Sequence, residues 1–227
     1  MSILIIAPLR SLPQAPVAVW IDVSRSMGVR DVTDESSRLT DRLTLAKLMT
    51  RDHIVAFPPG TELSLGVFGG DSLLLTPKTL DRESVLARLE GVSIGMSPGG
   101  SALSSIPSDP KTQRLILTDG GDLADLPDSL KKGDSLMLIG SAEGGPIPVE
   151  NSFFGSTYIT ENGAPVISRV DGSLIQKSRA KALVRQITNY SKSDTITRGV
   201  PAGAFPIALY CILLALLIPT RTRHRHE

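Results

Sequence analysis

The chain has 227 residues, a formal net charge of +1 and a single cysteine, Cys211. This length is sufficient for one domain with a buried core plus an additional segment. The near-neutral charge and the few aromatic side chains exclude the basic footprint and the stacking surfaces of a nucleic-acid-binding protein. One cysteine excludes an intramolecular disulfide and a cysteine-based zinc site.

The first half of the chain predicts strands and helices in alternation. The apolar run VAVWI is typical of a buried strand, and apolar residues at helical spacing before Pro58 indicate an amphipathic helix. In chain order we predict a strand over Val17–Ile21, a polar loop over 30–40, a helix over Asp41–Phe57, a strand over Glu62–Phe68, a short hairpin partner over Ser72–Leu75 and a helix over Asp81–Leu89.

The second half adds further strands that are apolar on both faces. A glycine-rich loop covers 95–101, and Pro107 and Pro110 leave room for at most a short helix after it. The remaining predicted elements are strands over Arg114–Leu117 and Ser135–Ile139, an inserted loop and hairpin over 141–172 and a last amphipathic helix from about Ser173 to Tyr190. This alternation predicts an α/β fold, a Rossmann-like, doubly wound, mostly parallel sheet flanked by helices.

A run of 22 residues without a charge, between Arg198 and Arg221, predicts a transmembrane helix. As a helix, such a run is about 33 Å long, which is enough to cross a hydrocarbon core of about 30 Å. We therefore divide the chain into a short apolar lead (1–11), a folded domain (12–192), a linker (193–202), a transmembrane helix (203–219) and a basic tail (220–227).

The two ends of the chain give conflicting predictions for membrane sidedness. Basic residues after the membrane helix predict a cytoplasmic tail and a domain outside the cytoplasm. The lead MSILIIAPL has no basic region before it and no small-residue cleavage site, so it is a poor export signal. A start further upstream and a tail-anchored, cytoplasmic domain are the two ways to reconcile these features, and we favour a periplasmic domain.

Polar residues follow three apolar or glycine-rich segments at what is predicted to be one edge of the sheet. Asp22, Ser24 and Ser26 follow the first strand, Ser101 follows the glycine-rich loop, and Asp119 ends the strand RLILTD. In an open α/β sheet, ligands bind beyond the carboxyl ends of the strands. Two carboxylates and three hydroxyls suit a hard cation such as Mg²⁺, and weak hydroxyl ligands leave the ion able to accept a partner's carboxylate.

The run DVSRSM at 22–27 resembles the DxSxS motif of von Willebrand factor A domains, which forms their metal-ion-dependent adhesion site. The resemblance implies that Ser24 and Ser26 contact the metal directly. It implies that Asp22 acts through water and anchors the strand, with Asp119 as the far carboxylate. Ser101, in GGS, stands where that family has a threonine, so it keeps the oxygen but lacks the methyl group that restricts the rotamer.

Further along, GSAEGGPIPVE at 140–150 and NGAPVISRVDGSLIQ at 162–176 resemble segments of Bat-type, MoxR-associated bacterial membrane proteins. The resemblance covers about 12–219 and implies a single-pass protein of the bacterial inner membrane that is not an enzyme. It implies binding of Mg²⁺, or of Mn²⁺ or Ca²⁺, and of a protein partner that offers an Asp or Glu carboxylate. The implied partners are a MoxR-type AAA+ ATPase and other von Willebrand factor A membrane proteins, beside the lipid bilayer.

One alternative stays open, namely a structural subunit of a membrane complex with an unoccupied metal site. The run GMSPG at 95–99 matches the G-x-S-x-G elbow of hydrolases, but the chain lacks a suitable histidine base. His53 is in a predicted helix, and the other two histidines follow the membrane segment. The acidic run over 119–128 lacks the glycine and glutamate of an EF-hand, so we interpret 122–128 as a solvated loop and helix start.

Overall fold

The structure, a computed structural model, describes residues 15–121, 126–149, 157–179 and 181–190. The predicted apolar lead, linker, transmembrane helix and basic tail lie outside the described residues. Within the described ranges, no helix is both long enough and apolar enough to cross a membrane.

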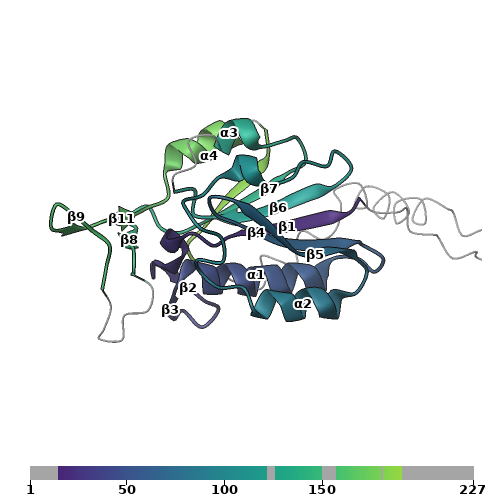
Figure 1. Cartoon of the computed structure of the whole chain (residues 1–227), viewed down its shortest axis with the longest axis horizontal. Coiled ribbons are helices and arrows are strands. Elements are labelled where there is room, and N and C mark those ends of the chain that lie inside the picture. The colour runs from purple at the N-terminus through teal and green to yellow at the C-terminus, as the bar shows by residue number, and fades with distance from the viewer. Residues whose placement is uncertain (1–14, 122–125, 150–156, 180, 191–227) are drawn as a thin grey trace, which may run out of the picture.

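Six strands form one sheet in the order β12-β7-β6-β1-β4-β5 (Figure 1). All neighbouring strands are parallel except β4 and β5, which form the predicted hairpin. All residues of β1 are buried, which explains why its sequence is apolar without alternation until Asp22. The strands of this sheet are β1 (Val17–Asp22), β4 (Leu63–Phe68), β5 (Ser72–Thr79), β6 (Gln113–Thr118), β7 (Ser135–Ile139) and β12 (Leu183–Ile187).

Helices cover both faces of the sheet, as predicted (Figure 1). One face carries α1 (Arg42–Ala56) and α2 (Arg82–Glu90), and the other carries α3 (Leu126–Ser129) and α4 (Gly172–Ser178). Three of the helices begin after an aspartate whose carboxylate accepts a hydrogen bond from a backbone amide of the first turn, which stabilises the helix start. These caps are Asp41, Asp81 and Asp171.

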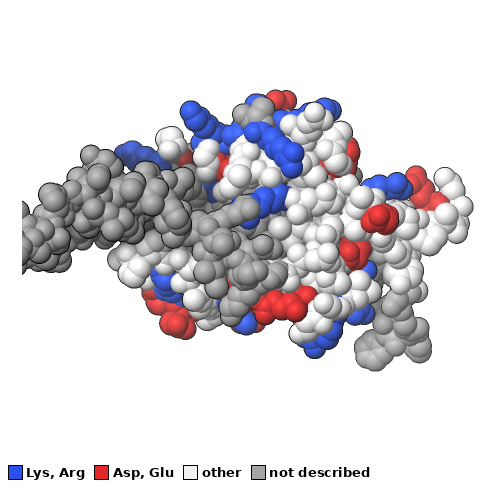
Figure 2. Space-filling view, turned by 180° about the vertical axis from the view of Figure 1, so that it is seen from behind, with Lys and Arg blue, Asp and Glu red and all other residues white. Residues whose placement is uncertain are grey.

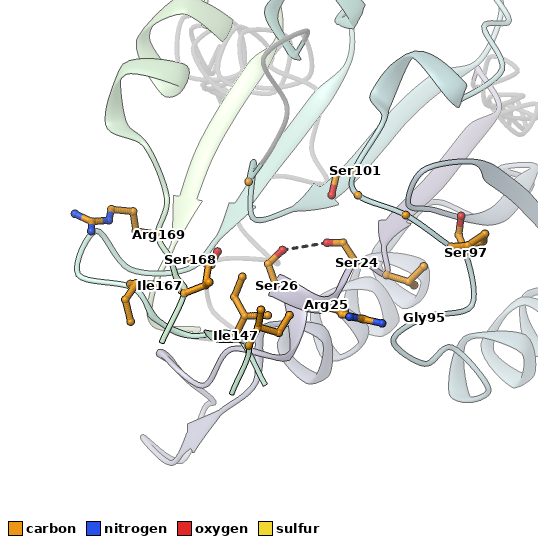
Figure 3. Close-up of a pocket in the computed structure, with 17 residues that line it drawn as sticks. Ser24, Arg25, Ser26, Gly95, Ser97, Ser101, Ile147, Ile167, Ser168 and Arg169 are labelled. Atoms are coloured by element: carbon orange, nitrogen blue, oxygen red, sulfur yellow. Dashed lines mark hydrogen bonds between the residues drawn. The ribbon is translucent and has the colours of Figure 1, made fainter. Parts of the chain in front are cut away.

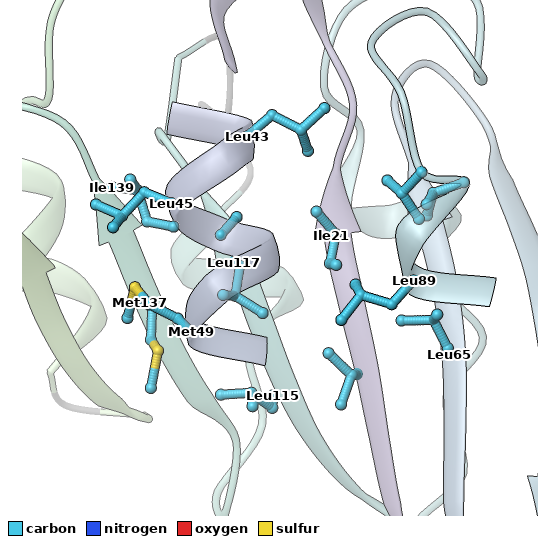
Figure 4. Packing of buried hydrophobic residues seen from close by; sticks show 14 of the residues in the cluster. Ile21, Leu43, Leu45, Met49, Leu65, Leu89, Leu115, Leu117, Met137 and Ile139 are labelled. Atoms are coloured by element: carbon cyan, nitrogen blue, oxygen red, sulfur yellow. The ribbon is translucent and has the colours of Figure 1, made fainter. Parts of the chain in front are cut away.

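Two apolar clusters, one on each face of the sheet, join the helices to the strands. Leu45 and Met49 of α1 pack over Leu117, Met137 and Ile139 (Figure 4). The cluster on the opposite face includes Trp20, Ile116, Leu138 and Ile175. Because both faces are covered, the edge at which the parallel strands end is where polar groups can gather.

The prediction of one helix from about Ser173 to Tyr190 is wrong. The chain forms the short helix α4 and then β12, which pairs in parallel with β7. Leu183, Val184 and Ile187 fit helical spacing, but they also fit a strand. The tertiary structure decides between the two, because β7 is a buried strand whose outer edge needs hydrogen-bond partners that β12 supplies.

The other departures from the prediction are extensions and additions. Strand β5 continues to Thr79, and the polar loop over 30–40 contains the ribbon β2 (Val32–Thr33) and β3 (Leu39–Thr40). The insertion predicted over 141–172 pairs as β8 with β11 and β9 with β10, and we call residues 145–168 the insert. Its strands are β8 (Gly145–Pro146), β9 (Thr160–Glu161), β10 (Ala164–Pro165) and β11 (Ile167–Ser168).

The charged side chains are mixed in sign over the described part of the face shown in Figure 2. Lys and Arg lie among Asp and Glu there, with uncharged surface between them. This distribution is in keeping with the formal net charge of +1.

Candidate metal centre

The first part of the site is the turn that follows β1. Asp22 is fully buried, and its Oδ1 accepts a hydrogen bond of 2.9 Å from the backbone amide of Ser24. The chain then enters the 3-10 helix η1 (Arg25–Gly28), which the buried side chain of Met27 holds against the core. This tight turn places the hydroxyl oxygens of Ser24 and Ser26 3.1 Å apart.

The glycine-rich loop brings Ser101 to the same point. Its hydroxyl donates a hydrogen bond of 2.8 Å to Oδ2 of Asp22. The loop is held against the end of β4, where the amide of Gly70 donates to the Pro98 carbonyl at 2.9 Å. A Cβ on Gly70 would lie 2.5 Å from that carbonyl oxygen, so the close approach requires glycine. The short 3-10 helix η2 (Leu103–Ser105) follows the loop, as the prolines predict.

The third part is the end of β6. Thr118 is buried, and its hydroxyl donates a hydrogen bond of 2.5 Å to Oδ2 of Asp22. Thr118 was not among the predicted site residues, although the parallel pairing of Leu117 with Ile21 places the next residues of the two strands side by side. Asp119 follows, and the amide of Gly121 donates to its Oδ1 at 3.0 Å.

Asp119 lies close to the serines but is bonded elsewhere. A Cβ on Gly121 would lie 3.3 Å from Asp119 Oδ1 and 3.7 Å from Ser26 Oγ, so the two oxygens face the same small space. Oδ2 of Asp119 accepts hydrogen bonds from Arg42 Nη1 at 2.6 Å and from Ser168 Oγ at 3.1 Å. One carboxylate oxygen therefore faces the site, and the other is used in an internal ion pair.

Arg42 is a further residue of the site that no sequence motif indicated. Its side chain is fully buried and binds Asp31 with two hydrogen bonds, of 2.8 and 2.7 Å, in addition to Asp119. It also donates to the hydroxyl and the carbonyl of Ser168 in the insert. Burial alone lowers the pKa of Arg42, but the hydrogen bonds to Asp31 and the charge of Asp119 offset this, so its pKa is raised.

The electrostatics of the two site carboxylates differ. Asp119 has the guanidinium of Arg42 beside it, whereas the hydrogen bonds donated to Asp22 by described residues come from neutral amides and hydroxyls. Burial, together with the charge of Asp119, raises the pKa of Asp22 from 3.8 to about 6. Hydrogen bonds from Thr118 and Ser24 act in the opposite direction. Asp22 is thus a buried carboxylate without a cationic partner among the described side chains.

The donor set fits a small divalent cation. Adjacent ligands of an octahedral Mg²⁺ at about 2.1 Å lie about 3.0 Å apart, close to the 3.1 Å between the Ser24 and Ser26 hydroxyls. All of the candidate donors are oxygens, as hard cations prefer. In the described part of the chain, no group of three or more His, Cys, Asp or Glu residues is placed to hold a metal ion. Any cation here would depend on the serines.

The serines form the floor of a pocket of about 730 Å³. Ser24, Ser26 and Ser101 lie together at its centre, and Ile147 and Ile167 of the insert form a wall beside them (Figure 3). The structure therefore brings four of the predicted site residues into direct contact, with Asp119 next to them, below an open cavity.

The hydrolase interpretation has no support in the geometry. Ser97 borders the pocket, but its hydroxyl donates to the backbone carbonyl of Asp71 at 2.8 Å. His53 lines a different pocket with Val17 and Gln113, the first residues of β1 and β6, at the opposite end of the strands. Of the predicted acidic loop, 122–125 lie outside the described residues, and Asp128 is an exposed residue of α3.

Comparison with protein-family models gives no match, and comparison with curated protein sequences gives none either. Solved structures do match. BatB from Bacteroides thetaiotaomicron, a conserved hypothetical protein, aligns with a TM-score of 0.66 and 23% identity over 82% of this chain and 96% of its own. An aerotolerance-related membrane protein from Bacteroides fragilis aligns with a TM-score of 0.63 and 20% identity, over 81% and 96% of the two chains. The chain therefore shares its fold with these two proteins, and its mostly parallel sheet flanked by helices is the α/β fold that the sequence predicts.

Proposed function

We propose that this domain is a membrane-anchored interaction module, not an enzyme, that binds a divalent cation and through it a partner protein. Ser24, Ser26 and Ser101 would be direct ligands, with Asp22 and Asp119 acting through water. Mg²⁺ is the proposed cation, with Mn²⁺ and Ca²⁺ as substitutes. The observation that carries the proposal is the convergence of these oxygens at the floor of an open pocket, beside the buried carboxylate of Asp22, which has no cationic partner among the described side chains.

The chain's own residues explain why such a site would attract a partner's carboxylate. The direct ligands are neutral hydroxyls, and one of the two nearby carboxylates, Asp119, is already paired with Arg42. The ligands that would touch a bound cation directly carry no negative charge, so the cation would remain able to accept a stronger ligand. An Asp or Glu of a partner protein, reaching the open pocket, would complete the coordination.

The partner and the location rest on the family resemblance. A MoxR-type AAA+ ATPase and other von Willebrand factor A membrane proteins are the proposed partners. The fold is shared with a protein described as an aerotolerance-related membrane protein, which supports a membrane location for this chain. We propose anchoring in a bacterial inner membrane, with the domain in the periplasm.

A scaffold without a bound cation is the second candidate, and one observation favours it. The guanidinium of Arg42 already supplies a cation to Asp119, 2.6 Å from its carboxylate. In that case the pocket would hold neighbouring proteins by shape alone, and Mg²⁺ would leave the stability of the domain unchanged.

Titration with Mg²⁺ and Mn²⁺ distinguishes the two candidates. A ligand that binds only the folded state stabilises it by about 2.7 kcal/mol at 100 times its Kd. In thermal and urea unfolding of the purified chain, we expect added metal to raise the free energy of unfolding. We expect no such increase in Asp22→Ala or in the double variant Ser24→Ala/Ser26→Ala. Ser104→Ala, at an exposed serine near the loop, is the control and retains the gain. Equal stability of the unmodified chain with and without metal would establish the scaffold instead.

Replacing Ser101 by threonine is expected to tighten Mg²⁺ binding. The added methyl group restricts the side chain to fewer rotamers, so less entropy is lost when the hydroxyl is held by the cation. Freezing one side-chain rotor costs about 0.5–1 kcal/mol, which corresponds to a roughly two- to fivefold lower Kd. Calorimetric titration of Ser101→Thr and Ser101→Ala measures this, and the alanine variant is expected to bind more weakly than the unmodified chain. An unchanged Kd in both variants would remove Ser101 from the ligand set.

A further inference from the structure

The wall of the pocket that the insert forms is apolar, and none of its side chains belongs to the proposed cation ligands. Ile147, Ile159 and Val166 of the insert line it, and backbone hydrogen bonds connect all three. Ile147 donates to Val166 at 3.0 Å, Ile159 donates to Ile147 at 2.9 Å, and Val166 donates to Ile159 at 2.8 Å. Ile167, which is 43% exposed, extends this wall. Branched apolar side chains are thus presented to the cavity on a backbone that is already hydrogen-bonded.

The insert is also tied to the floor of the site. Ser168, which follows Ile167, bonds both Arg42 and Asp119 through its hydroxyl. The amide of Ser141, just before the insert, donates to Asp31, which is itself bound to Arg42. The apolar wall and the serine cluster therefore share one buried network and keep a defined position relative to each other.

The charge around the pocket points to the kind of occupant. Arg25 and Arg169 are exposed and lie on either side of the serine pair in Figure 3. Among the described residues that line the pocket, none is acidic and none is aromatic. The two arginines favour an acidic occupant over a basic one, and the lack of aromatic side chains offers no stacking surface for a base.

We infer that the pocket binds an extended peptide segment of a partner protein in which an aliphatic residue stands next to an Asp or Glu. The carboxylate lies over Ser24, Ser26 and Ser101, and the aliphatic side chain packs against the apolar wall formed by Ile147, Ile159, Val166 and Ile167. This inference rests on the proposed function, and it adds the identity of the residue beside the carboxylate. Burying the aliphatic side chain against this wall contributes affinity that a serine at the same position lacks.

Synthetic peptides test the inference directly. Six fluorescent eight-residue peptides carry a central Leu-Asp, Ser-Asp or Leu-Asn pair, in either order, between glycines. Binding to the full chain is followed by fluorescence polarisation in the presence of Mg²⁺. We expect Leu-Asp to bind about tenfold more tightly than Ser-Asp in at least one order. Equal affinity for the two would overturn the inference.

Variants of the wall provide the second test. Ile159→Ser and Ile167→Ser, singly and together, are expected to remove the preference for Leu-Asp over Ser-Asp while leaving the binding of Ser-Asp unchanged. Leu74→Ser is the matched control, because Leu74 is 52% exposed on β5 at the far edge of the sheet. A preference that survives in the double variant would show that another surface binds the leucine, and the inference would fall.

The Leu-Asn peptide separates this inference from the proposed function. If Leu-Asn binds as well as Leu-Asp, and chelation of Mg²⁺ has no effect, the cation-mediated function fails. If Leu-Asp and Ser-Asp both need Mg²⁺ and bind equally, the function stands and only the apolar subsite fails. Tighter binding of inorganic phosphate than of any Asp peptide, at the same arginines, would also overturn the peptide as occupant.

Discussion

Arg42→Met is expected to lower the free energy of unfolding by about 3–5 kcal/mol, although Arg42 is not among the proposed ligands. The guanidinium is fully buried between Asp31 and Asp119, whose side chains are 4% and 0% exposed. Methionine retains the apolar stem but leaves two carboxylates in the interior without their cation. The cost is the desolvation of those charges, which solvent cannot offset at this depth.

Urea unfolding measures the loss, and two further variants define its cause. Arg51→Met is the control for a surface ion pair, because Arg51 and its partner Glu90 are 50% and 58% exposed, and a change within about 1 kcal/mol is expected. Arg42→Lys keeps the charge but not the planar fork that reaches both carboxylates, so an intermediate loss is expected. If Arg42→Met and Arg51→Met lose the same amount, the buried network is not the source of stability.

The stability of the metal-free domain is expected to fall as the pH rises through 6, because of Asp22. Its pKa is raised from 3.8 to about 6 in the folded state, so between these values the folded protein binds the proton more tightly than the unfolded chain. The contribution of Asp22 protonation to the free energy of unfolding is fully present below about pH 4 and is lost by about pH 7. The shift corresponds to about 3 kcal/mol at most.

Asp22→Asn isolates this effect from all other titrating groups. Asparagine keeps the shape but carries no charge at any pH, so the variant gains stability relative to the unmodified chain as the pH rises from about 4 to about 8 in EDTA. Ser104→Ala, at an exposed residue without a titratable side chain, is the control and keeps a constant difference. A constant difference for Asp22→Asn as well would mean that Asp22 is ionised throughout this range. A cation bound as proposed would hold Asp22 ionised and would therefore remove this pH dependence.

The fold could be predicted largely from local pattern. Strands β1, β6 and β7 are continuous apolar runs because both faces of the sheet are covered, and α1 and α2 follow capping aspartates and end at predicted positions. Strand β12 could not be predicted in this way. Its apolar residues fit a helix equally well, and only the open edge of β7 in the assembled sheet decides in favour of a strand.

The candidate site, like the fold, could be predicted in part from local sequence. Alternate positions of one short segment hold Asp22, Ser24 and Ser26, and predictable elements precede Ser101 and Asp119. The topology of a parallel sheet then brings these residues together at its carboxyl edge. The residue types at the end of each strand are a local property of the sequence, and the parallel arrangement of the strands brings them together.

The charge balance of the site was decided by the tertiary structure alone. Arg42 is the first residue of α1, where an arginine is usually solvated, and nothing local marks it as buried. It reaches Asp31, Asp119 and Ser168, which are 11, 77 and 126 residues away in the chain. The position of the apolar wall beside the serines depends on the same network, because Ser168 at the end of the insert bonds Arg42 and Asp119. Local sequence thus determined the oxygens of the site, and long-range packing determined which of them are neutralised and what lies above them.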